Sequence, residues 1–106
     1  MPRRGSRCLF YVSSKHAVEG MTKSAALEAA SSGVRVNAVG PGPIETGMLN
    51  RFTGTAERKA TLAKSVPLGR VGDPAEIARA AILLASEKAS FVTGQILTAD
   101  GGKTAG

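Results

Sequence analysis

The stretch SSGVRVNAVGPGP, residues 31–43, decides the fold class of this chain. Its central residues, 34–39, place apolar side chains at alternate positions, which is the pattern of a β-strand. Gly33 precedes them where a helix would end in a left-handed residue, and the breakers at 40–43 end the strand. A helix, a glycine turn, a strand and a Gly/Pro loop form half of a βαβ unit, so the sequence predicts an α/β fold with a parallel sheet.

The segment before this stretch predicts a helix over residues 11–30. It is rich in alanine, and Val18, Met21 and Ala25 recur at three- and four-residue spacing, which gives an apolar stripe. Residues 1–10 contain a proline, a glycine and three arginines and offer too little for a helix start. We therefore expect a basic N-terminal tail at 1–10 and a main domain at 11–106.

The segment after the stretch predicts two more helices and a second strand. Residues 57–65 favour a short helix. Asp73 is a helix N-cap, Pro74 suits the first helical position and Glu76 completes a capping box, so a helix should run to about residue 86. Residues 95–99 predict a strand. Two strands would bury too little to hold three helices, so the chain is expected to be the C-terminal part of a larger doubly wound parallel sheet.

The composition narrows the class of protein further. The net charge is +6, but apart from the N-terminal arginines the charges are mixed in sign and no aromatic-basic platform is present, which argues against nucleic-acid binding. No apolar run approaches the 18 residues of a membrane span. Cys8 is the single cysteine, which suits a cytoplasmic protein. No cluster has the spacing of metal ligands, so we expect no metal site.

Tyr11 and Lys15 form a candidate acid–base pair. Residues four apart lie on one face of a helix, with Cβ atoms about 6 Å apart. An ammonium group near a phenol favours the phenolate, which makes the hydroxyl a better proton donor or acceptor near neutral pH. The spacing also occurs by chance in many helices, so an exposed pair without chemistry is the alternative.

An ordered set of motifs resembles the short-chain dehydrogenase/reductase family, and particularly its 3-oxoacyl-carrier-protein-reductase-like and glucose-dehydrogenase-like members. The motifs are Y-x-x-x-K at 11–15, AVEG at 17–20, VRVNAV at 34–39, PGPIET at 41–46, PLGR at 67–70, DP-x-EIA at 73–78, VTGQ at 92–95 and DGG at 100–102. The resemblance implies a Rossmann-type fold, an NAD- or NADP-dependent oxidoreductase, a small alcohol or carbonyl substrate and a homo-oligomer, either a dimer or a tetramer.

The resemblance also implies roles for individual residues. Tyr11 would be the general acid/base, and Lys15 would bind the nicotinamide ribose hydroxyls and activate Tyr11. Pro41 and Gly42 would line the nicotinamide pocket.

Two further residues are implied to hold the carboxamide of the nicotinamide, namely the backbone of Ile44 and the side chain of Thr46. For Thr46 the alternative is a helix-cap or loop hydroxyl. Asn37 is expected to bond to backbone at a strand end, and Glu45, Asp73 and Glu76 are expected to be structural.

Three function hypotheses follow from the sequence. By resemblance, the glycine-rich phosphate loop and the catalytic serine of the family would precede Met1, so the chain resembles about two-fifths of such an enzyme. The first hypothesis is an oxidoreductase whose cofactor site is completed elsewhere. The second is a truncated, non-catalytic fragment that acts through association with a partner subunit. The third, a nucleic-acid-associated peptide, has only the arginine tail in its favour.

Overall fold

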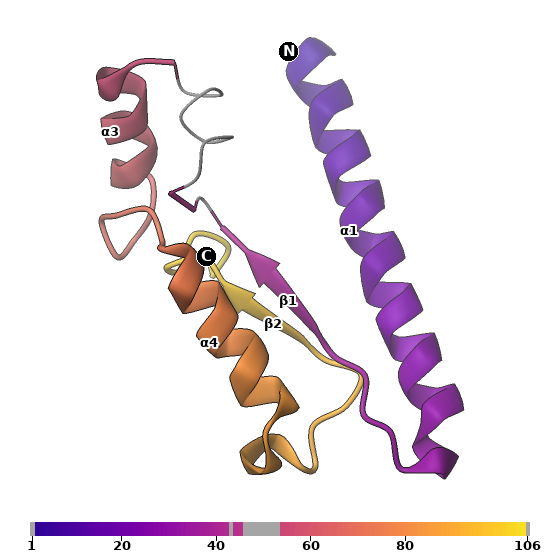
Figure 1. The fold of residues 1–106 in the computed structure, drawn as a ribbon. Helices are drawn as coiled ribbons and strands as arrows, with labels where there is room; N and C mark the ends of the chain where they lie inside the picture. The colour runs from indigo at the N-terminus through magenta and orange to yellow at the C-terminus, as the bar shows by residue number, and fades with distance from the viewer. Residues whose placement is uncertain (1, 43, 46–53, 106) are drawn as a thin grey trace. The chain divides into compact units, whose positions relative to one another are not determined.

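The computed structural model describes residues 2–42, 44–45 and 54–105, and the side chains of residues 2–8 and 10–12 lie outside that description. The chain forms two compact units, Met1–Ala38 with Ser90–Ile96 and Val39–Ala89 with Leu97–Gly106. The elements in order are α1 (Pro2–Ala29), η1 (Ala30–Ser32), β1 (Ala38–Pro41), α3 (Ala56–Lys64), α4 (Pro74–Ala85), η2 (Glu87–Ala89) and β2 (Ile96–Ala99) (Figure 1).

β1 and β2 form a two-stranded parallel sheet, as the sequence predicted. The Ala38 N–H donates to the Gln95 carbonyl at 2.9 Å, and the Gly42 N–H donates to the Ala99 carbonyl at 3.1 Å. Donor and acceptor positions both advance along the chain, which only a parallel register allows, and the two arrows point the same way in Figure 1. The carboxyl ends of both strands therefore lie at one edge of the sheet.

The first strand starts at Ala38, four residues later than the predicted start at residue 34. Just before the strand, the Gly94 N–H donates to the Val36 carbonyl at 2.7 Å, and side-chain hydrogen bonds of Asn37 supply further contacts. The Asn37 amide donates to the Val92 carbonyl at 2.9 Å and accepts from the Gln95 N–H at 3.0 Å. The expected structural role of Asn37 is confirmed.

Helix α1 starts at Pro2, so the expectation that residues 1–10 contain no helix start is wrong. Proline suits the first helical position because its missing N–H would have no partner within the helix. At the other end, Gly33 has φ of 72° and its N–H bonds to the Ala30 carbonyl, which confirms the predicted left-handed terminus. Helix α1 thus includes residues on both sides of residue 10, where the predicted tail ends.

The buried face of α1 differs from the predicted stripe. Among the α1 side chains that the structure describes, Thr22 and Ala26 are buried, whereas Met21 is 68% exposed and Val18 is 48% exposed. A Cβ placed on Gly94 would lie 3.5 Å from the Ala26 Cβ, so the small side chain of Ala26 lets the helix approach the chain at Gly94. Burial follows the small residues at four-residue spacing rather than the larger apolar ones.

Helices α3 and α4 have nearly the predicted bounds, and α4 has the predicted cap. Thr55 caps α3 through its hydroxyl, which accepts from the Arg58 N–H at 3.2 Å. Pro74 begins α4, and the Glu76 carboxylate accepts from the Asp73 N–H at 2.9 Å, as a capping box requires. Both helix starts are therefore fixed by local contacts.

Few side chains of the described residues are buried. The buried hydrophobic ones are Ala26, Val66 and Ala89, while Leu27 is 80% and Phe91 fully exposed. This is little apolar burial for a chain of 106 residues, and it agrees with the sequence-based view of a larger domain. In the part of the chain described here, no helix combines the length and hydropathy needed to cross a membrane.

Candidate functional site

The predicted acid–base pair lies on α1, in the first unit. The backbone of Tyr11 is helical, and its side chain is outside the described part of the structure. Lys15 follows one helical turn later and is exposed. A four-residue separation within a continuous helix places both residues on one face. Thr46, the predicted carboxamide ligand, lies outside the described residues.

Pro41 and Gly42 lie where β1 ends, in the second unit. Pro41 is exposed and is the last residue of the strand. A Cβ on Gly42 would lie 2.6 Å from the Asp100 Cβ and 2.7 Å from its Cα. Gly42 is therefore packed directly against the end of β2, and this contact alone requires a glycine. Its predicted place in a nicotinamide pocket stays a prediction.

Ile44 forms an isolated parallel bridge with Gly72, in the segment that leads into α4. The neighbouring Glu45 N–H donates to the Gly72 carbonyl at 2.8 Å. Successive N–H groups of an extended chain point to opposite sides. The N–H of Ile44 is consequently directed away from Gly72. On that other side of the chain it can donate to another group.

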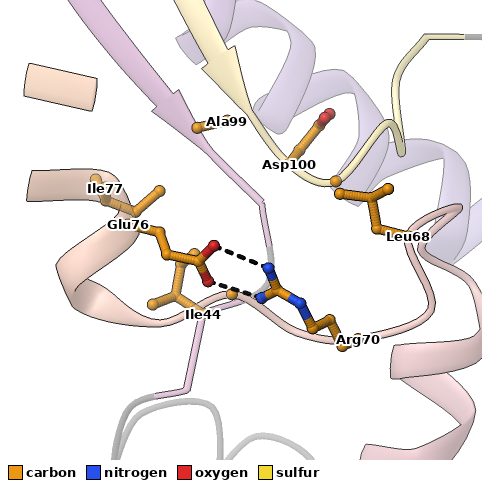
Figure 2. Close-up of a pocket in the computed structure, with 9 residues that line it drawn as sticks. Ile44, Leu68, Arg70, Glu76, Ile77, Ala99 and Asp100 are labelled. Atoms are coloured by element: carbon orange, nitrogen blue, oxygen red, sulfur yellow. Dashed lines mark hydrogen bonds and ion pairs between the residues drawn. The ribbon is translucent and has the colours of Figure 1, made fainter. Parts of the chain in front are cut away.

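A cavity of about 260 Å³ lies beyond the carboxyl ends of the two strands, within the second unit. Figure 2 shows that its wall combines the ends of the strands with the segments around α4. The lining residues are Ile44, Leu68, Arg70, Gly72, Glu76, Ile77, Ala99, Asp100 and Gly101. This is the edge at which α/β folds bind ligands. Of the residues predicted from sequence, Ile44 lines the cavity.

An ion pair between Arg70 and Glu76 forms one side of this cavity (Figure 2). The two guanidinium nitrogens lie 2.7 and 2.9 Å from the two carboxylate oxygens, a bidentate geometry. The Arg70 guanidinium, followed by the Asp73 N–H, lowers the pKa of Glu76 to about 2. Because Glu76 also caps α4, the ion pair connects the loop that contains Arg70 to the start of this helix. The charges of Arg70 and Glu76 neutralise each other.

Asp100 also lines the cavity and organises the turn after β2. Its carboxylate accepts from the Gly102 N–H at 3.0 Å, the Thr104 N–H at 3.0 Å and the Thr104 hydroxyl at 2.6 Å. The Thr104 hydroxyl is the largest cause that lowers the pKa of Asp100. A carboxylate with three donors shapes the cavity wall rather than supplying a proton.

Sequence reasoning noted the motifs that contain Arg70 and Asp100 but gave neither residue a place in the site. For Arg70 a signal existed, because an arginine shortly before an acidic helix cap is well placed to bind it. For Asp100, the DGG spacing marks a turn, but nothing local reveals that Gly42 packs against it.

A nicotinamide cofactor fits the described residues at two places. The Ile44 N–H is directed away from Gly72, and an N–H of this kind suits an acceptor such as the carboxamide oxygen. The exposed Lys15 ammonium has three donors, which suits ribose hydroxyls. Within the described residues, no group of three or more histidine, cysteine or acidic side chains is arranged to hold a metal.

Comparison with known proteins defines the class. Residues 3–104 match the family model described as Enoyl-(Acyl carrier protein) reductase. A short chain dehydrogenase family protein from Francisella tularensis has a similar structure, with a TM-score of 0.80 and 38% identity over 91% of this chain and 43% of the other. The chain belongs to the short-chain dehydrogenase/reductase family, and its fold is the C-terminal part of that family's Rossmann-type sheet.

Individual relatives place the chain among oxidoreductases. The Uncharacterized oxidoreductase YmfI of Bacillus subtilis is 46% identical over 92% of this chain and 40% of its own length. The 3-oxoacyl-[acyl-carrier-protein] reductase FabG of Vibrio cholerae is 51% identical over 87% and 37%. An Agrobacterium tumefaciens structure with bound NADP has a TM-score of 0.81 and 42% identity over 91% and 39%. The chain thus spans about two-fifths of the length of these relatives.

Proposed function

We propose that this chain contributes the acid–base half of an NAD- or NADP-dependent oxidoreductase, which interconverts an alcohol and a carbonyl compound. The observation that carries the proposal is the Tyr11–Lys15 pair on α1 in a chain of this family. Support for the cofactor class comes from the relative that holds NADP. Bound nicotinamide supplies hydride transfer, and the protein supplies position and a proton path.

Each predicted residue has one task in this proposal. The Tyr11 hydroxyl donates a proton to the carbonyl oxygen in reduction and takes one from the alcohol in oxidation. The Lys15 ammonium binds the ribose hydroxyls and stabilises the phenolate of Tyr11. Pro41 and Gly42 border the nicotinamide ring.

The carboxamide of the nicotinamide is bound by the Ile44 backbone and the Thr46 hydroxyl. The substrate is a small alcohol or carbonyl compound, since family members such as the reductase of Vibrio cholerae act on a 3-oxoacyl group according to its name. The assembly is a homo-oligomer, a dimer or a tetramer, in the cytoplasm.

The test compares Tyr11→Phe with Lys15→Ala in a form of the protein that turns over. Tyr11→Phe removes the acid–base hydroxyl and keeps the ring, so kcat should fall about 10²–10⁴-fold while cofactor affinity stays almost unchanged. Lys15→Ala should reduce both. Near-normal turnover in Tyr11→Phe contradicts the mechanism.

The second candidate function is a non-catalytic chain that associates with a partner subunit. The exposure of Leu27, Ile82 and Phe91, at 80%, 67% and 103%, is compatible with it, because a partner subunit that covered these side chains would bury apolar surface. Titration of the chain with NADH and NADPH separates the candidates. A saturable fluorescence change supports the oxidoreductase, and its absence together with association in sedimentation velocity supports the partner-binding chain.

A further inference from the structure

An ion pair holds the residue next to Ile44. The Glu45 carboxylate pairs with the Lys59 ammonium of α3, 14 residues further along the chain. The side chains are 41% and 32% exposed, so the pair is partly shielded from water. The Glu45 N–H meanwhile donates to the Gly72 carbonyl at 2.8 Å. Glu45 is therefore fixed through both its side chain and its backbone.

These two contacts determine how the Ile44 peptide is oriented. Neighbouring planar peptide groups are related by only two soft dihedral angles, so fixing Glu45 restricts Ile44 as well. The hydrogen bond from the Glu45 N–H to Gly72 is part of the parallel bridge between Ile44 and Gly72, which keeps the chain extended at Ile44. The contacts of Glu45 thus restrict the direction of the Ile44 N–H, and Ile44 itself lines the cavity (Figure 2).

We propose that Glu45 and Lys59 are positioning residues that keep the Ile44 N–H ready for the nicotinamide carboxamide. The inference rests on the proposed function, because it assigns the ion pair a task in that site. The pair also connects Lys59 of α3 to Glu45, the residue that follows the proposed carboxamide donor Ile44. Neither residue touches the carboxamide.

A role in general stability predicts something different. Partly exposed ion pairs contribute little to the free energy of unfolding. Loss of the pair should therefore leave global stability almost unchanged and act locally, on the exchange of the Glu45 amide proton and on the binding of the nicotinamide. This local effect distinguishes positioning from stabilisation.

The experiment uses the ¹⁵N-labelled chain of 106 residues and amide-resolved NMR. The probe is reduced nicotinamide riboside, which carries the carboxamide and ribose but no charge, so a change of protein charge does not itself attract or repel it. Lys59→Met and Glu45→Gln break the pair, and Lys59→Arg conserves it. Lys64→Met is the matched control, because it removes the same charge from the last turn of the same helix.

The expected result has three parts. The Ile44 amide signal shifts on addition of the probe to the wild-type chain. Lys59→Met and Glu45→Gln each weaken that binding about threefold and speed exchange of the Glu45 amide by a similar factor, the size that couplings of exposed ion pairs give. Lys59→Arg and Lys64→Met behave as the wild type.

Three outcomes overturn the inference. Unchanged probe affinity or unchanged Glu45 exchange in Lys59→Met removes the positioning role while the proposed function stands. An equal effect of Lys64→Met shows that total charge is the cause. No response of Ile44 in the wild-type chain overturns the inference together with the proposed carboxamide contact, and it is seen before any variant is made.

Discussion

Replacement of Gly42 by alanine should destabilise the second unit, because the new methyl group meets main-chain and Cβ atoms that have little room to move. The added Cβ would lie 2.6 Å from the Asp100 Cβ, 2.7 Å from its Cα and 3.3 Å from its carbonyl oxygen. Carbon atoms in ordinary contact are about 3.5–4.0 Å apart. The ends of β1 and β2 must therefore separate by about 1 Å, although the Gly42 N–H and the Ala99 carbonyl hold them together.

The expected cost is about 1–3 kcal/mol, the usual range for overpacking a tight contact. In a chain of this size, this lowers the melting temperature by roughly 5–20 °C. Urea unfolding followed by far-ultraviolet circular dichroism measures the change, with a lower midpoint and an unchanged slope.

Gly20→Ala is the matched control, since it makes the same chemical change at a different site. A Cβ on Gly20 has no atom within 4 Å, and the residue lies inside α1. Alanine should stabilise the helix there by about 1 kcal/mol. The two variants are thus expected to change stability in opposite directions. If Gly42→Ala is as stable as the wild type, the steric reasoning is refuted.

Two further predictions concern the polar contacts. The folded-state pKa of Glu76, about 2, lies below its ordinary value of 4.5, so its ion pair stabilises the fold above pH 4.5 and this contribution is lost as the pH falls toward 2. The difference in urea midpoint between wild type and Glu76→Gln should therefore shrink between pH 7 and pH 2.5, and a constant difference contradicts the assignment. Asn37→Ala removes two hydrogen bonds that join residues far apart in the chain and should cost about 1–3 kcal/mol in the same urea assay. A loss below the error of the measurement argues against the bridging role of Asn37.

Much of the local structure could be predicted because its causes lie within a few residues. Asp73, Pro74 and Glu76 define the start of α4 by themselves, since the capping contacts span a single helical turn. Gly33 marks the end of the first helical segment because glycine adopts a positive φ without steric cost. The alternating apolar pattern indicated a strand over 34–39, and the structure contains one that starts four residues later, at Ala38.

The predictions were wrong where contacts between residues far apart in the chain set the start of a strand or the buried face of a helix, and where a segment with few helix signals still became helical. β1 starts at Ala38 because Asn37 bonds to residues 92 and 95 instead of joining the ladder. Thr22 and Ala26 are buried because small side chains allow close approach, which periodicity alone does not reveal. The early start of α1 at Pro2 shows that a segment poor in helix signals can still extend an adjoining helix.

For the site, the sequence by itself indicated the family, through the order of the motifs, and it predicted Tyr11 and Lys15 as an acid–base pair through their spacing. The resemblance also implied that Pro41 and Gly42, which follow the first predicted strand, line the nicotinamide pocket. Only the tertiary structure decided which groups surround Ile44, that Gly42 packs on Asp100, and that Lys59 and Arg70 satisfy Glu45 and Glu76. The physical reason is range: helix faces and caps depend on neighbours within a turn, whereas these contacts join segments that approach each other only after the chain has folded.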